Sequence, residues 1–180
     1  MQLYNTEKSW GAVAQILHWV IFVLFVGQLT VGLIMTDMEP SDQKWFFYGT
    51  HKAMGIVILG FVIARILWRL KSIIPADPKV PVWQLKAAET VILFLYFVML
   101  ALPITGLIMS LLGGHNISFF GLFTIEAFGK VPGISGVANE AHTYLSYAVI
   151  AAIAVHILAA LYHHYIIKDD VLRRMLPGSK

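Results

Sequence analysis

The chain has 180 residues, of which 58% are hydrophobic and only 13% are charged, with a formal net charge of +3. A water-soluble domain of this length needs far more charge to cover its surface, so the composition predicts a single membrane domain, residues 1–180. No basic tract with interleaved aromatic residues is present, which excludes nucleic acid as a partner. Cysteine is absent, and this excludes disulfides, thiolate metal sites, iron–sulfur clusters and covalently attached haem c.

Four stretches are apolar over the roughly 20 residues that are needed to cross a bilayer. They lie at about 11–35, 49–70, 84–112 and 140–167, and connections rich in polar residues, Pro or Gly separate them. The first stretch is too long for the apolar region of a signal peptide, and no A-x-A cleavage site follows it, so we expect a retained helix. A short interfacial helix is expected at 119–128. The predicted fold is an all-α bundle of four transmembrane helices.

Lysine and arginine are unevenly distributed between the two sides of this predicted bundle. One side holds only Lys44, Lys52 and Lys130. The side with both termini holds ten: Lys8, Arg65, Arg69, Lys71, Lys79, Lys86, Lys168, Arg173, Arg174 and Lys180. Because cytoplasmic loops carry an excess of these residues, both termini are predicted to be cytoplasmic. Five tryptophans lie near span ends, as in an aromatic belt: Trp10, Trp19, Trp45, Trp68 and Trp83.

Four of the seven histidines lie deepest in the predicted spans or open one: His18 in the first, His51 at the start of the second, and His142 and His156 in the fourth, whose far end also holds His163 and His164. Ionisable side chains inside a membrane are costly and are usually functional. His142 and His156 are 14 residues apart, nearly four helical turns, so they share a helix face and are separated by about 21 Å. The alternating direction of the spans gives His18 the depth of His156, and His51 the depth of His142. The sequence therefore predicts two histidine pairs at two depths.

Two imidazoles that face each other across a bundle suit the two axial positions of a haem iron. Most neighbours one turn from the histidines are small, which would leave room for a porphyrin: Ala14, Gly55, Ala138, Ser146, Ala152 and Ala160, with Phe22 as the exception. A haem with both axial positions filled exchanges electrons and binds no substrate at iron. The residues alone leave a second interpretation, a small transporter whose histidines bind a divalent metal such as zinc. Against it, no Asp or Glu lies in the middle of a span to complete a cation site.

Several short strings are similar to those of one known family, the bacterial cytochrome b561 family. They cover nearly the whole chain: LHW at 17–19, HKAMG at 51–55, RILWR at 65–69, ALPITG at 101–106, LYHHY at 161–165, KDD at 168–170 and LRRM at 172–175. The resemblance implies a four-helix bundle in the bacterial inner membrane with two b haems. The family's ligands correspond to His18, His51, His142 and His156.

The resemblance also implies a function, electron transfer between a quinone pool, such as ubiquinone, and a periplasmic or membrane redox protein. One branch of the family oxidises superoxide while it reduces ubiquinone, so a superoxide:ubiquinone oxidoreductase is the alternative. Many members carry a histidine in the third helix, four residues before a tyrosine. This chain has the tyrosine, Tyr96, but Ile92 stands at the histidine position.

Further polar residues near the span ends are candidates for secondary roles. Arg65 and Arg69 could neutralise the propionates of the haem on the side of the termini, and Lys52 those of the other haem, although all three also suit membrane anchoring. His163, His164 and Glu89 are candidate quinone contacts or proton carriers. The alternative is that these residues only complement helix dipoles at the interface.

Overall fold

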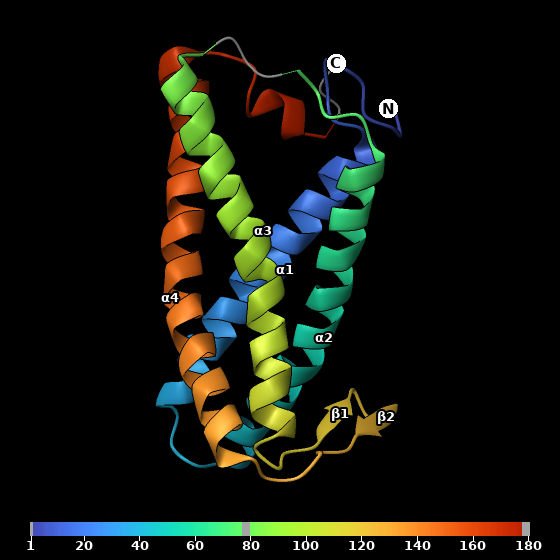
Figure 1. Cartoon of the computed structure of the whole chain (residues 1–180), viewed down its shortest axis with the longest axis vertical. Coiled ribbons are helices and arrows are strands. Elements are labelled where there is room, and N and C mark those ends of the chain that lie inside the picture. The colour runs from blue at the N-terminus through green and yellow to red at the C-terminus, as the bar shows by residue number, and fades with distance from the viewer. Residues whose placement is uncertain (1, 77–79, 178–180) are drawn as a thin grey trace.

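The computed structural model describes residues 2–76 and 80–177. It contains four long helices, α1 (Ala12–Asp37), α2 (Asp42–Lys71), α3 (Val82–Leu111) and α4 (Pro132–Tyr162), and a π-helical turn, η1 (His163–Ile167), continues α4. All four are long and apolar enough to cross a membrane, and they run along the long axis of the molecule (Figure 1). The all-α, four-helix architecture predicted from the sequence is confirmed.

Helices α2 and α4 begin well before the apolar stretches from which they were predicted. α2 begins at Asp42, because the Ser41 hydroxyl accepts a hydrogen bond from the Lys44 backbone N–H (3.2 Å) and caps the first turn. α4 begins at Pro132, whose fixed φ suits the first helical position. Hydropathy marks only the part of a helix that fits hydrocarbon, whereas these residues set where the helix starts.

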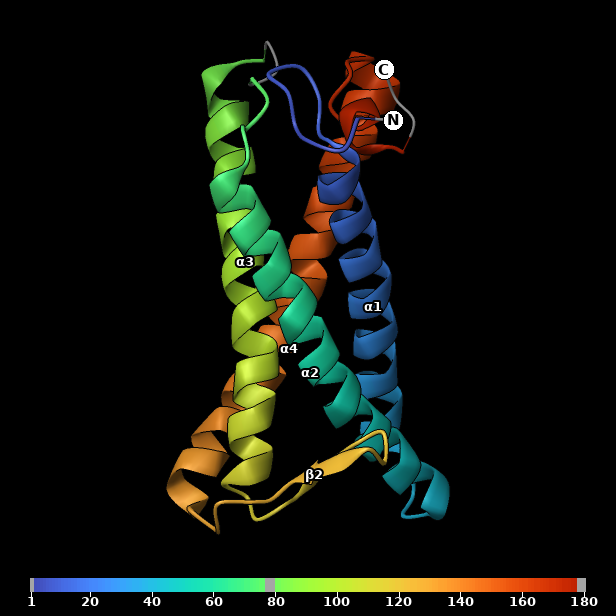
Figure 2. The same ribbon diagram turned by 90° about the vertical axis from the view of Figure 1, so that its right-hand side faces the viewer.

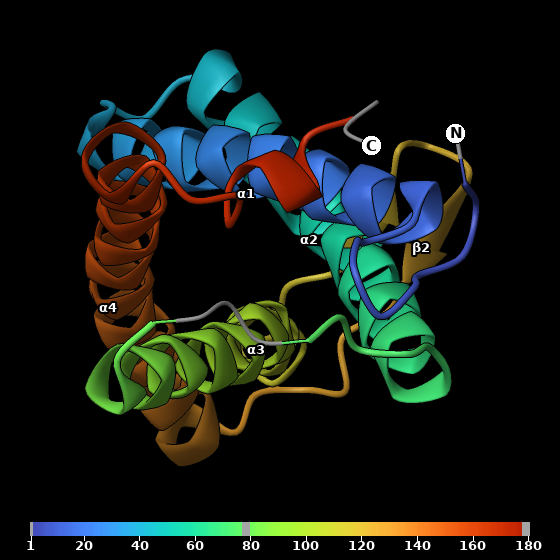
Figure 3. The same ribbon diagram turned by 90° about the horizontal axis from the view of Figure 1, so that it is seen from above.

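The helices pack in chain order, with α1 against α2, α2 against α3, and α3 against α4. In the described part of the chain, no comparably extended backbone packing joins α4 to α1 or α2, and Figure 3 shows the four inclined helices arranged around the long axis. A small apolar core ties them together at mid-height: Ile21, Phe25, Ile58, Val62, Val98, Leu102 and Val149. In the described chain, α4 therefore meets α1 and α2 mainly through side chains, with Val149 at the centre of the core.

Both termini lie at one end of the bundle, together with the connection between α2 and α3 (Figure 1). The opposite end holds the connection between α1 and α2 and the long connection before α4. Lys79 and Lys180, which we assigned to the end with the termini, lie outside the described residues. The assignment of this end to the cytoplasm stays a prediction from charge.

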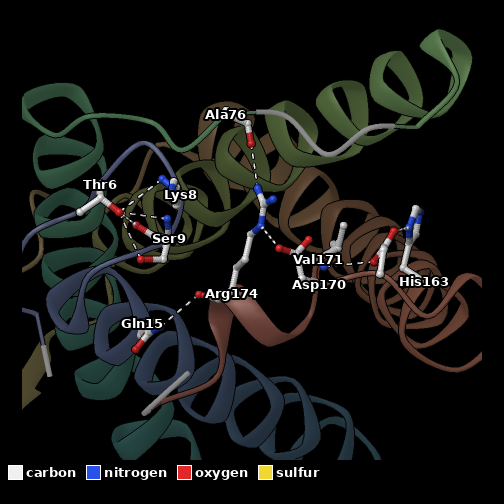
Figure 4. Close-up of polar contacts among 10 residues, drawn as sticks. Thr6, Lys8, Ser9, Gln15, Ala76, His163, Asp170, Val171 and Arg174 are labelled. Atoms are coloured by element: carbon white, nitrogen blue, oxygen red, sulfur yellow. Dashed lines mark hydrogen bonds and ion pairs between the residues drawn. The ribbon is translucent and has the colours of Figure 1, made fainter. Parts of the chain in front are cut away.

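Polar contacts close the end with the termini (Figure 4). Arg174, in the 3₁₀ turn η2 (Arg173–Met175), donates from Nη1 to the Ala76 carbonyl and from Nε to Asp170 Oδ2, both at 2.8 Å. Gln15 Nε2 of α1 donates to the Arg174 carbonyl (3.1 Å). The C-terminal segment therefore joins α1 to the α2–α3 connection.

The expected helix at 119–128 is wrong. The segment forms an antiparallel hairpin of β1 (Ile117–Phe119) and β2 (Phe123–Ile125), in which Ile117 pairs with Ile125 and Phe119 with Phe123. Phe120 and Gly121 adopt positive φ angles of 52° and 78°, which reverse the chain and are incompatible with a helix. Phenylalanine also favours strands over helices. Figure 2 shows the hairpin lying across the end of the bundle opposite the termini.

Candidate functional site

His18 of α1 and His156 of α4 face each other on the side of the termini. Their ring centres are 6.1 Å apart, and the ring planes make an angle of 61°. Both side chains are half-buried. We call these two residues the termini-side pair.

His51 of α2 and His142 of α4 form the second pair, toward the hairpin. Their ring centres are 6.3 Å apart, with an angle of 78° between the planes. We call them the hairpin-side pair. The structure thus brings together the same partners that helical phase and depth matched in the sequence. Since α4 supplies one member of each pair, the spacing of 14 residues from His142 to His156 separates the pairs by about 21 Å.

Two glycines on neighbouring helices allow close approach to the hairpin-side rings. A Cβ atom at Gly106 would lie 3.2 Å from His142 Cε1, and one at Gly32 would lie 3.3 Å from His51 Cε1. Sequence reasoning selected Gly55 and missed both of these glycines, because they lie on helices other than those of the histidines that they contact. The glycine in the ALPITG string is Gly106, and that string was the available signal.

Helix α3 supplies no histidine, but it orients one. His142 Nδ1 lies 2.9 Å from the Leu102 carbonyl oxygen and 3.2 Å from Thr105 Oγ1. A carbonyl only accepts hydrogen bonds, so Nδ1 must carry the proton, which leaves the lone pair of Nε2 free for another bond. The sequence did not identify Leu102 or Thr105 as part of the site.

A cavity of about 220 Å³ adjoins the hairpin-side pair, with His51, His142, Gly32, Gly106 and Lys52 among its lining residues. His51 Nδ1 is buried and has no hydrogen-bond partner, an uncommon state for a buried polar atom. The cavity and the unsatisfied nitrogen mark this pair as a binding site.

The spacing of the rings tests whether a haem iron fits between them. An imidazole nitrogen lies about 1 Å from its ring centre and bonds a metal at about 2 Å, so two rings on opposite sides of one metal atom are centred about 6 Å apart. Both observed separations, 6.1 and 6.3 Å, match this value. The ring planes are inclined to each other by 61° and 78°, so neither pair is stacked face to face. The residues present therefore fit two metal centres with imidazole on both sides.

Within residues 2–76 and 80–177, no three His, Cys, Asp or Glu side chains gather closely enough to hold a metal ion. Each histidine pair therefore stands without a carboxylate or a third imidazole. A zinc site normally has three or four protein ligands, so a divalent-metal transporter has no ligand cluster in this part of the chain.

The candidate cations lie near the two pairs. Arg65 donates from Nη1 to the Ala14 carbonyl (3.2 Å), one turn before His18 in α1. The guanidinium groups of Arg65 and Arg69 lie over the Tyr96 ring, at 5.8 and 5.6 Å from its centre. In the described chain, neither arginine forms an ion pair with a carboxylate. This leaves both charges free to pair with a bound anion.

The three candidate quinone contacts do not share one environment. His163 Nδ1 lies 2.6 Å from Asp169 Oδ2 in a half-buried pair, and Asp169 was not foreseen from the sequence although the KDD string contains it. His164 Nδ1 is buried without a hydrogen-bond partner. Glu89 is exposed and lies about two turns into α3, not in the first turn as the dipole argument required.

A four-helix membrane bundle with two opposed imidazole pairs at different depths fits the class of membrane cytochromes that hold haem without covalent attachment. Comparison with known proteins makes the assignment specific. The model of the prokaryotic cytochrome b561 family matches residues 9–178, and the chain belongs to this family. Membership implies haem b as cofactor and electron transfer across a membrane.

Three relatives span nearly the full length of the chain. Cytochrome b561 homolog 2 of Escherichia coli (strain K12) is 32% identical over 99% of this chain and 97% of its own. Cytochrome b561 homolog 1 of the same organism is 32% identical over 91% and 94%. The probable superoxide oxidase CybB of Yersinia pestis is 28% identical over 97% and 99%.

Proposed function

We propose that the chain carries electrons across a bacterial inner membrane through two haems b, between a quinone pool and a redox protein. One haem would be held by His18 and His156, and the other by His51 and His142. The observation that carries the proposal is the pair of ring separations, 6.1 and 6.3 Å, at two depths along α4. The excess of Lys and Arg on the side of the termini supports a cytoplasmic location for both termini.

The chain's own residues have defined tasks in this proposal. A bound haem supplies a reversible one-electron iron couple. If each pair holds one haem through both of its imidazoles, the iron would have no protein-free ligand position for a substrate, and the site would transfer electrons only. The Leu102 carbonyl fixes the tautomer of His142, while Gly32 and Gly106 let the rings of this pair sit close to α1 and α3. We assign Arg65, Arg69 and Lys52 to ion pairs with the haem propionates.

Quinone chemistry requires protons as well as electrons. His163 extends from the end of α4, two turns beyond His156, and its hydrogen bond to Asp169 orients the ring. We assign proton transfer to quinone at the end with the termini to His163, with His164 as a neighbouring contact. Glu89 lies on α3 at the same end and is the third candidate.

Superoxide oxidation with quinone as acceptor is the second candidate function, because one relative carries the name probable superoxide oxidase. Ile92 stands where many family members have a histidine, which favours plain electron transfer. The test is reduction of ubiquinone by the purified protein when it is supplied with superoxide. A rate equal to that of protein-free solution would dismiss this candidate, and a rate abolished by superoxide dismutase would support it.

The haem assignment is tested by haem content. Purified protein should contain about two haems b per chain by the pyridine haemochrome assay, with low-spin b-type bands in the reduced-minus-oxidised spectrum. His142→Ala and His156→Ala should each lower the content to about one, because each removes a ligand of a different haem. His115→Ala, in an exposed loop outside both pairs, is the control and should retain two. Two haems retained in both ligand variants would refute the assignment.

A further inference from the structure

The β1–β2 hairpin has a composition unlike that of an exposed loop. Its nine residues, 117–125, contain no charged side chain. The polar residues that flank it close its base, where Asn116 Nδ2 donates to Glu126 Oε2 (2.5 Å) and Asn116 Oδ1 accepts from the Ala127 N–H (2.9 Å). The hairpin is therefore an apolar element with a polar base.

The strand register gives the hairpin two chemically different faces. Successive side chains of a strand point to opposite faces, so the pairs Ile117–Ile125 and Phe119–Phe123 share one face, and the pair Ser118–Thr124 has the other. Phe119 and Phe123 stack with ring centres 4.9 Å apart. One face is entirely apolar and the other carries two hydroxyls.

The apolar face begins inside the protein and ends outside it. Ile117 is only 1% exposed, lines the cavity beside the hairpin-side pair, and belongs to the strand that packs against α2. Toward the tip, Phe120, Leu122 and Phe123 are 46%, 78% and 54% exposed. An apolar surface that continues from the core into the surroundings marks an interaction site.

The position of the hairpin identifies what surrounds its tip. Figures 1 and 2 show it extending sideways past α2, level with the helix ends rather than beyond them. At the same end of α2, Trp45 and Phe46 are 59% and 67% exposed. Tryptophan side chains at this level of a membrane protein sit among the lipid headgroups, so Trp45 indicates that this end of α2, and the hairpin level with it, lie at the membrane interface.

We infer that the hairpin lies flat in the membrane interface and binds lipid through Phe120, Leu122 and Phe123. The pairing of the two strands satisfies the inner backbone groups, and the outer ones stay within reach of headgroups and water. A soluble partner would need a polar rim around the apolar centre, and the tip has no charged group to provide one. Lipid contact would also hold Ile117 against the cavity.

The chain has no cysteine, so a single introduced cysteine can be spin-labelled without first removing others. Phe123→Cys and Thr124→Cys are neighbours on opposite faces of β2 and form a matched pair, and Leu122→Cys samples the tip. Each labelled protein is reconstituted in vesicles of phosphatidylethanolamine and phosphatidylglycerol. Collision rates of the label are then measured with oxygen, which concentrates in lipid, and with a water-soluble nickel chelate.

The ratio of oxygen to nickel collision rates should be severalfold higher at positions 122 and 123 than at position 124. Equal ratios at 123 and 124, with high nickel access at both, would overturn the inference in favour of a hairpin in water. Shielding of positions 122 and 123 from both reagents would also overturn it, in favour of contact with protein. The full-length chain is used throughout, and the result does not depend on the haem assignment.

Discussion

The two histidine pairs use the same helix and similar ring spacings, but their surroundings differ. The termini-side pair lies beneath a polar cap of chain segments and beside the guanidinium of Arg65, which binds the α1 backbone one turn from His18. The hairpin-side pair adjoins a cavity, has one ring fixed by a carbonyl of α3, and is flanked by an apolar hairpin. We expect the Arg65 charge to be the main influence on the termini-side site. At the hairpin-side site we expect close packing and a neutral hydrogen bond to act beside the charge of Lys52, which lines the cavity.

The largest effect on haem content is expected at Gly106, which lies closest to a histidine ring of the hairpin-side pair. In Gly106→Val, even the first side-chain carbon would lie 3.2 Å from His142 Cε1, so the ring must move. We expect the haem content to fall from about two per chain to about one, with the termini-side haem retained, as measured by pyridine haemochrome. Gly60→Val is the matched control, because nothing lies within 4 Å of its Cβ position. Loss of both haems, or of neither, would contradict the prediction that close packing by α3 matters only at the hairpin-side pair.

A smaller effect is expected from charge. Arg65→Gln removes a cation beside the termini-side pair, and a cation favours the reduced state of a nearby iron. One unit charge at partly buried range contributes about 1–2 kcal/mol, or roughly 40–90 mV for a one-electron couple. The potential of the termini-side haem should fall by this amount in a spectroscopic redox titration, and that of the other haem should stay constant. Equal shifts in both haems would show that Arg65 does not act locally.

Arg69→Gln tests the same idea one turn further along α2. Arg69 lies over Trp10 and Tyr96 rather than against the turn of α1 that precedes His18. We expect a smaller fall in the potential of the same haem. A larger fall than in Arg65→Gln would assign the main electrostatic role to Arg69.

Much of this architecture follows from rules that act along one helix. Apolar length gave four helices, and helical phase together with span direction paired His18 with His156 and His51 with His142. Contacts between helices were not accessible in this way. Gly106 and Thr105 belong to a span without histidine, so nothing local marked them as neighbours of His142.

The hairpin shows a different reason for failure. Its Phe-rich segment is apolar enough for an interfacial helix, but the reversal at Phe120 and Gly121 depends on positive φ angles at two adjacent residues. Pairing between Ile117 and Ile125 then fixes the register. Residue composition does not distinguish these outcomes, because strand pairing is a contact between segments.

The smallest predicted effect is a shift in haem potential in a variant that removes a hydrogen bond at the hairpin-side pair but keeps the packing. Thr105→Val keeps the shape of the side chain but removes the oxygen 3.2 Å from His142 Nδ1, while the Leu102 carbonyl remains. A hydrogen-bond acceptor at Nδ1 makes the imidazole a stronger donor to metal and favours the oxidised state. Losing one of two acceptors should raise the potential of this haem by roughly 20 mV, equivalent to about 0.5 kcal/mol.

Thr90→Val supplies the matched control for this variant. Thr90 makes the same type of bond to the carbonyl four residues earlier in α3, is exposed, and touches neither pair. Both haem potentials of the Thr90→Val variant should equal those of the unmodified protein. If Thr105→Val left the potential of the hairpin-side haem unchanged but Gly106→Val expelled that haem, α3 would act on His142 through packing alone. The two sites would then differ in that the charge of Arg65 acts at the termini-side pair and close packing acts at the hairpin-side pair.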